Sequence, residues 1–215
     1  MSNHIEINND WNEQTPILIL INSYDGDVEW RKRLTLPYVV YTKTDPSRGP
    51  YNADNKAKSE TNLLKFIYEF YDRLPAHVVN VHQYEIKPYS HDGSLVDILN
   101  DPRLQEKFNN ENINGYWNFN SYIMGNAAPQ VEKMLACGWW QATMQPWFGD
   151  IHLYHDFTLG HKGCNQFIVS RERILSLPQT FYVNMYNWLV ENSTGPPRGV
   201  DHNDGPVDTW SGRGN

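Results

Sequence analysis

The sequence predicts a single α/β domain with a mostly parallel central sheet flanked by helices. Two short apolar runs, residues 16–21 and 38–41, lack polar alternation, which is typical of strands buried on both faces of a parallel sheet. Strand, helix and strand recur as far as residue 82, and this order favours an α/β sheet over an all-α or all-β fold. A chain of 215 residues is long enough for one domain with a sizeable core.

The first half of the chain supplies the predicted parallel strands. The first strand ends in the turn 22–27, and residues 28–36 are long enough for a crossover helix before the strand 38–41. Within 59–71, apolar residues at helical spacing predict an amphipathic helix. Leu74-Pro75 ends this helix, and residues 78–82 are expected to form the next strand.

The second half is less regular. Ser94 is placed to cap a short helix through residue 99, whereas 109–126 shows no assignable pattern. Pro129 suits the first turn of a helix over 130–135. A late strand is expected at 166–170, a helical segment at 171–175 and a long helix from 179 to about 191. The domain is therefore expected over 15–192, between a polar leader, 1–14, and a Gly/Pro-rich tail, 193–215.

Charge and motif content narrow the function classes. A net charge of −7 disfavours nucleic acid as the main partner, because binding its backbone needs clustered Lys and Arg. The amino-terminal residues show neither a basic start nor an apolar run, so we expect a cytoplasmic protein without a membrane span, and Cys137 and Cys164 as reduced thiols. The sequence lacks the glycine-containing motifs of serine hydrolases, P-loop NTPases and NAD dehydrogenases.

The order of motifs along the chain resembles an uncharacterised domain-of-unknown-function family. Members carry an Asn/Glu-led helix ending in Tyr-Asp-x-Leu-Pro, an apolar strand ending at a His, and a following His-Asn element. A carboxyl-terminal signature completes the pattern, and the resemblance spans roughly residues 16 to 190. The matching residues are 22–24, 38–43, Asn55, Glu60, 71–75, 78–82, 89–92, 166–174, Pro178 and 181–182.

This resemblance implies a fold similar to that of the GT-A (Rossmann-like) glycosyltransferases. Such enzymes move a sugar, here a hexosyl or pentosyl group, from a nucleotide sugar to a glycan or other acceptor. A strand in that fold ends in an Asp-x-Asp that holds Mn²⁺ or Mg²⁺ against the donor's diphosphate. A non-catalytic carbohydrate-binding or assembly protein that keeps this fold is the alternative.

Ligands of open parallel sheets bind outside the carboxyl ends of the strands. The side chains expected there supply amides and hydroxyls for the base and ribose, and an ammonium for phosphate charge. The same residue types are also common in turns for conformational reasons. The predicted donor-binding residues are Asn22, Tyr24, Lys43, Asn55 and Glu60.

The expected metal site departs from the two-carboxylate pattern. The third strand ends in His82 and is followed by Glu85, which together with His91 and Asp92 offer ligands for a divalent ion such as Mn²⁺. The alternative is a hydrogen-bonded His82 and a solvent-facing Glu85. A literal Asp-x-Asp at 25–27 follows the first strand, where we interpret it as a turn.

Asp150 and Asp156 are candidate general bases that would deprotonate the acceptor hydroxyl. They lie in a His-rich segment that is also the best sequence argument for a metal-dependent hydrolase, although no His-Glu-x-x-His or Cys pair supports zinc. Indole rings can bind the acceptor sugar or fill the core. The histidines of the segment are His152, His155 and His161. The tryptophans considered for the acceptor are Trp117, Trp139, Trp140 and Trp147.

Overall fold

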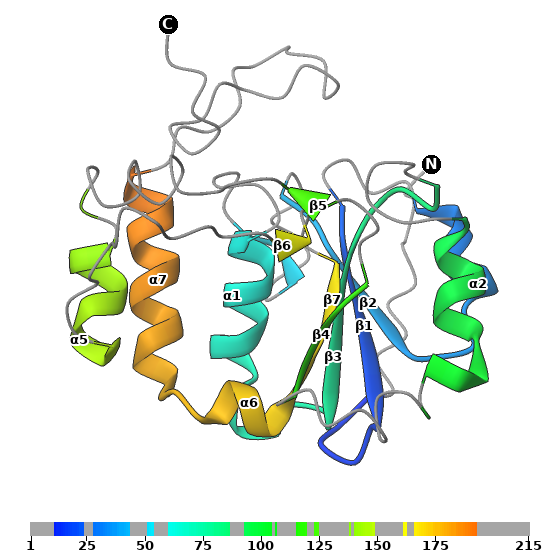
Figure 1. The fold of residues 1–215 in the computed structure, drawn as a ribbon, viewed down its shortest axis with the longest axis horizontal. Coiled ribbons are helices and arrows are strands. Elements are labelled where there is room, and N and C mark those ends of the chain that lie inside the picture. The colour runs from blue at the N-terminus through cyan, green and yellow to red at the C-terminus, as the bar shows by residue number, and fades with distance from the viewer. Residues whose placement is uncertain are drawn as a thin grey trace, which may run out of the picture.

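The computed structural model describes residues 11–23, 28–43, 51–53, 60–86, 93–104, 106, 115–119, 123–124, 138, 140–148, 161–162 and 166–192. A central sheet is covered on both faces (Figure 1). The 3-10 helix η1 (Glu29–Arg33) and helix α2 (Leu95–Asn100) pack on one face. Helices α1 (Glu60–Glu69) and α7 (Gln179–Asn192) pack on the other, which confirms the α/β class.

Among the described residues, the main sheet has five strands in the order β2-β1-β3-β7-β4. Strand β1 pairs in parallel with β2 and β3, whereas β7 pairs antiparallel with β3 and β4. It follows that β4 runs in the same direction as β1, and β7 is the reversed strand of this sheet. The strands are β1 (Ile17–Asn22), β2 (Tyr38–Tyr41), β3 (His77–His82), β4 (Tyr116–Asn118) and β7 (Phe167–Ser170).

The expectation of a mostly parallel sheet is therefore not confirmed, because the sheet is mixed. A four-residue apolar strand such as β7 carries no information about its direction, which depends on where the preceding chain approaches the sheet. Strands β5 (Ile123–Met124) and β6 (His161–Lys162) form a separate antiparallel pair.

Strand β1 is buried along its whole length. Leu18 and Leu20 face the core under α1 and α7, and Ile19 and Ile21 face the core under η1 and α2. The alternation places apolar side chains on both faces, as the continuous apolar run predicts.

Hydrogen bonds between side chains and the backbone position the last helical segments. Ser170 caps α6 (Arg171–Leu175) by accepting from the Arg173 N–H, at 3.1 Å. The Tyr182 hydroxyl donates to the Ile174 carbonyl at 2.7 Å, and the Tyr71 hydroxyl, in the 3-10 helix η3 (Tyr71–Arg73), donates to the Leu177 carbonyl at 2.6 Å. The predicted helices at 171–175 and 179–191 and the Ser94 cap of α2 are confirmed.

Two segments differ from expectation. The crossover at 28–36 holds the five-residue 3-10 helix η1 in place of a longer helix, and such short 3-10 turns are common in connections. Its Trp30 and Arg31 are buried, and the Arg31 guanidinium donates back to the Val28 carbonyl. The unassigned stretch 109–126 contributes β4 and β5, whose two or three residues are too few to show a period.

The predicted helix at 130–135 lies outside the described residues. Farther along, the π-helix η4 (Trp140–Met144) leads into α5 (Gln145–Phe148). Trp11, from the predicted leader, packs against Phe66 and Phe70 at ring-centroid distances of 5.5 and 5.2 Å. Within the part of the chain that the structure describes, no helix is long and apolar enough to cross a membrane.

Candidate functional site

The connections that follow β1 and β2 lie on opposite faces of the sheet. The β1–β2 connection carries η1 on the α2 side, and the β2–β3 connection carries α1 on the α7 side (Figure 1). The connections therefore diverge between the carboxyl ends of β1 and β2, where Asn22 and Tyr41 are register partners. In open α/β sheets this divergence opens the crevice that binds ligands.

Asn22 is the buried polar residue at this point. Its Nδ2 donates to the Asn80 Oδ1 and to the Val81 carbonyl, both at 2.8 Å. Its Oδ1 is buried and has no hydrogen-bond partner among the described residues. Since an unmet buried acceptor costs about 1–3 kcal/mol, this oxygen is a ready acceptor for a donor group on a ligand.

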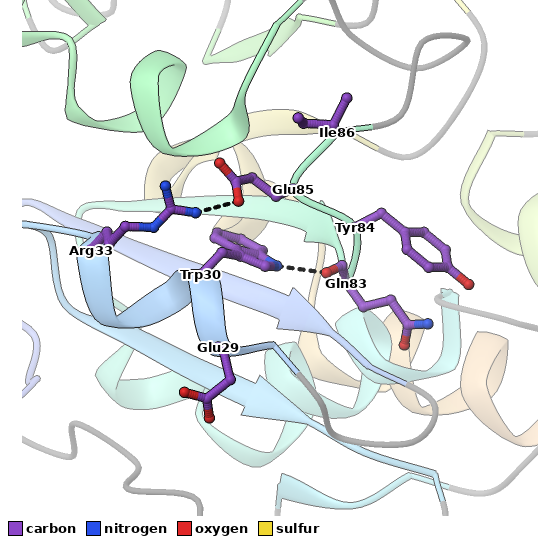
Figure 2. A pocket seen from close by; sticks show the side chains of 7 residues that line it. All are labelled: Glu29, Trp30, Arg33, Gln83, Tyr84, Glu85 and Ile86. Carbon is purple, nitrogen blue, oxygen red and sulfur yellow. Dashed lines mark hydrogen bonds and ion pairs between the residues drawn. The ribbon is translucent and has the colours of Figure 1, made fainter.

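The residues after β1 and β3 are joined side to side. The Ser23 N–H donates to the Tyr41 carbonyl at 2.8 Å, and the Ser23 hydroxyl donates to the Gln83 Oε1 at 3.3 Å. From η1, the Trp30 Nε1 donates to the Gln83 carbonyl at 2.6 Å (Figure 2). Gln83 is thus held from two elements. Sequence reasoning missed it because glutamine after a strand carries no signal.

Lys43, a predicted phosphate-binding residue, is buried just beyond β2. Its Nζ donates to the hydroxyl of Thr61, a fully buried residue in the first turn of α1, at 2.6 Å. An ammonium beside the amino end of a helix is favourable for an anion, because the helix N–H groups and dipole add to its charge. Glu60, the first residue of α1, is exposed.

Of the four predicted metal ligands, two are described. His82 is half-buried at the end of β3. Glu85 accepts from the Ser94 hydroxyl at 2.6 Å through Oε1 and forms an ion pair with Arg33 through Oε2. The Ser94 hydrogen bond, followed by that from Arg33, holds the pKa of this carboxyl below its ordinary value. Both carboxylate oxygens are therefore engaged by protein donors.

No three His, Cys, Asp or Glu side chains gather into a metal-binding group within the described ranges. His91 and Asp92 lie outside those ranges, so the metal set stays a prediction. The remaining predicted site residues also lie outside the described residues. They are Tyr24, Asn55, Asp150 and Asp156, with the Asp-x-Asp at 25–27, His152, His155 and Trp139.

The other indoles and the His-rich segment are partly described. Trp117 is half-buried and packs against Phe119 at 5.9 Å, on the core under η1 and α2. Trp147 is 38% exposed, and its ring contacts Phe181 of α7 at 6.1 Å. Trp140 begins η4, and His161 lies in β6. The described ring contacts favour a packing role for Trp117.

A pocket of about 540 Å³, open to solvent, lies between η1 and the segment that follows β3 (Figure 2). Gln83 belongs both to this pocket and to the hydrogen-bonded ends of β1 and β3. The pocket therefore adjoins the crevice. Its lining residues are Glu29, Trp30, Arg33, Gln83, Tyr84, Glu85 and Ile86.

Comparison with known proteins defines the family. No curated protein and no solved structure matches the chain. Residues 18–207 match the model of a family described as "protein of unknown function (DUF3431)". The match covers most of the 215 residues and confirms the expected membership of an uncharacterised family. The chain with this mixed sheet and its polar crevice therefore belongs to the DUF3431 family.

Proposed function

We propose that this protein binds a nucleoside diphosphate sugar at the carboxyl ends of β1, β2 and β3 and transfers the sugar to an acceptor hydroxyl. The observation that carries the proposal is the buried Oδ1 of Asn22, which has no partner among the residues that the structure describes, at the divergence of the two connections. A hydroxyl of the ribose or an N–H of the base would supply the missing donor.

Lys43 supports a diphosphate rather than an uncharged ligand. Its buried ammonium and the amino end of α1 lie at the same edge of the sheet as Asn22, because β1 and β2 are parallel and Asn22 pairs with Tyr41. A diphosphate in this crevice would therefore meet positive charge with little water around it. A GT-A-like arrangement of the sheet is part of the proposal and accords with four strands of one direction beside the reversed β7.

In the proposed reaction, the acceptor hydroxyl attacks the anomeric carbon while the bond to the diphosphate breaks. The hydroxyl proton passes to a general base, for which Asp150 and Asp156 are the candidates. A divalent metal, if bound, would stabilise the leaving charge. Glu85 does not fit as its ligand while Ser94 and Arg33 engage both oxygens. The proposal therefore assigns stabilisation of the leaving diphosphate to Lys43.

The test measures the melting temperature of the protein with UDP-, GDP- and dTDP-sugars, each with and without Mn²⁺. A ligand that binds only the folded state stabilises it by about 2.7 kcal/mol at a hundred times its Kd. We expect one nucleotide class to raise the melting temperature. Lys43→Met should abolish this rise, because it removes the charge but keeps most of the side-chain length.

Lys65→Met is the matched control, since its Nζ donates at 2.7 Å to the carbonyl of Asn52 and not to the Thr61 hydroxyl. The control should keep the ligand-induced rise. No rise with any nucleotide, or an equal rise in Lys43→Met, would sink the proposal.

A non-catalytic carbohydrate-binding role is the second candidate. It is favoured by the contacts of Glu85, a predicted metal ligand. Ser94, the cap of α2, and Arg33 engage its two carboxylate oxygens. The two roles differ in turnover: a binding protein would retain the nucleotide sugar intact over hours, whereas a transferase would release nucleoside diphosphate when an acceptor is added. Release of diphosphate, measured by chromatography, decides between them.

A further inference from the structure

The pocket between η1 and the segment after β3 is not needed to hold a nucleotide diphosphate, yet it has the lining of a ligand site. We propose that this pocket binds a neutral sugar ring, which, if the proposed function holds, is the acceptor. The pocket is described by its seven lining residues, and it adjoins the crevice through Gln83.

The pocket combines fixed aromatic and aliphatic surface with polar groups. Trp30 is fixed by its hydrogen bond to the Gln83 carbonyl and lies between Arg33 and Gln83 in Figure 2. Tyr84 is 43% exposed and Ile86 is 66% exposed, so both side chains offer apolar surface to a ligand in the pocket. Sugar rings present C–H faces that pack on such surface.

The polar groups match neighbouring hydroxyls. Arg33 and Glu85 point toward each other across the pocket wall (Figure 2), so a donor and an acceptor lie side by side. The Ser94 hydroxyl holds the other oxygen of Glu85 at 2.6 Å, which fixes the carboxylate. Each carboxylate oxygen of Glu85 can accept a second hydrogen bond, and the Arg33 guanidinium has further N–H donors. Two adjacent hydroxyls of a sugar, which both donate and accept, can therefore bind beside this ion pair without breaking it.

The charge of the lining disfavours an anionic ligand. Two carboxylates, Glu29 and Glu85, line the pocket against one guanidinium, Arg33. Arg33 is already paired with Glu85, and Glu29 accepts from the Lys32 Nζ at 2.5 Å on the exposed side of η1. A phosphate here would face more negative than positive charge, in contrast to the surroundings of Lys43.

The position of the pocket suits an acceptor. Ser23 follows Asn22 directly, and its hydroxyl bonds the Gln83 side chain that enters the pocket lining. A sugar in the pocket would therefore lie next to a donor bound at the ends of β1 and β3. Proximity of this kind supplies much of the rate of a transfer between two bound substrates.

The test measures sugar binding without nucleotide, by saturation-transfer NMR with methyl glycosides of glucose, galactose, mannose and N-acetylglucosamine. We expect at least one glycoside to bind. Tyr84→Ala should weaken it by about three- to tenfold, because the ring contact is lost. Arg33→Ala should weaken the same glycoside, because the donor beside Glu85 is removed.

Tyr116→Ala is the matched control, since Tyr116 is also 43% exposed but lies on β4 against Phe167. The control should bind as the unaltered protein does, and the melting temperatures of all variants should show that they are folded. Binding of no glycoside, or equal weakening by Tyr116→Ala and Tyr84→Ala, overturns the inference. So does Tyr84-dependent binding of adenosine or inorganic phosphate in place of a sugar.

The outcomes separate this inference from the proposed function. Glycoside binding that depends on Tyr84, without any effect of nucleotides on the melting temperature, would support the sugar site and contradict the proposed transferase function. A nucleotide effect that depends on Lys43, without glycoside binding, keeps the donor site and removes the pocket as the acceptor site.

Discussion

Asn22 donates two hydrogen bonds to β3, while its own buried side-chain oxygen has no partner in the described part of the chain. Asn22→Ala removes the donor from the Asn80 Oδ1 and from the Val81 carbonyl. We expect a loss of about 1–3 kcal/mol in the free energy of unfolding, because two buried acceptors lose this donor. Urea unfolding measures this loss.

Asn192→Ala is the comparison for this substitution. Asn192 lies exposed at the end of α7, where its amide donates to the Trp188 carbonyl at 2.8 Å. Its removal should change stability by less than about 0.5 kcal/mol. Similar losses in the two variants would show that the amide of Asn22 contributes nothing beyond a surface hydrogen bond.

His77 gives the folded protein a pH dependence at the opposite end of β3. Burial lowers its pKa below the ordinary value, an effect partly opposed by the Pro16 carbonyl 3.0 Å from Nδ1. The unfolded chain therefore binds a proton at a higher pH than the folded one. The contribution is fully present above about pH 6.5, the unfolded pKa, and is lost as the pH falls through the folded pKa.

We therefore expect stability to fall between pH 7 and pH 5, and His77→Gln to flatten this part of the profile. Urea unfolding at each pH measures the profile. Parallel profiles for the two proteins would contradict the assignment to His77.

At the scale of elements, Gly115 connects the start of β4 to the cap of α6. Its φ is +73°, and a Cβ there would overlap the Ser170 Oγ and lie 3.0 Å from the Arg173 Cβ. Gly115→Ala therefore displaces the side chain that caps α6, in addition to the strain of a left-handed residue. Ser170 also donates its N–H to the Gly115 carbonyl at 2.8 Å.

A substitution at Gly93 separates the cost of backbone strain from the cost of displacing the Ser170 cap. The φ of Gly93 is +84°, and no atom lies within 4 Å of a Cβ built on it. Gly93→Ala should cost about 1–2 kcal/mol from backbone strain alone. Gly115→Ala should cost about 1 kcal/mol more, the value of a lost helix cap. Equal midpoints in thermal unfolding would show that Ser170 moves aside without loss.

The elements that sequence patterns predict are those with local signals. An apolar run predicts strand β1, and Ser94, whose hydroxyl caps α2, predicts where this helix begins. The direction of β7 and the existence of β4 depend on partners distant in sequence, so no local pattern carries them. In the site, Asn22 and Lys43 are predictable as polar residues after strands. Gln83 becomes visible only through its partners, Ser23 and Trp30.

At the scale of the whole molecule, the two cores meet at the main sheet. Ile19 contributes to the core under η1 and α2, and Leu20 to the core under α1 and α7, both with 0% exposure. Ile19→Ala and Leu20→Ala should each lower the free energy of unfolding by about 2–5 kcal/mol. Their similar cost would show that the helix layers on both faces contribute comparably.

Leu175→Ala serves as the control, since this side chain of α6 is 44% exposed. It should cost less than about 1 kcal/mol, because little apolar area returns to water. A cost for either core variant no larger than that of Leu175→Ala would contradict burial on that face. Urea unfolding of the three variants provides the measurement.

The place of β7 between β3 and β4 bears on how the chain matures during synthesis. Protein chains leave the ribosome from the amino end, so β3 emerges well before residues 167–170. Until then, the edge of β3 that faces β7 lacks its native neighbour, and such edges pair readily with strands of other chains. Helix α7 follows β7 along the chain and packs against α1. The edge of β3 is therefore covered only late in synthesis, once residues 167–170 have emerged.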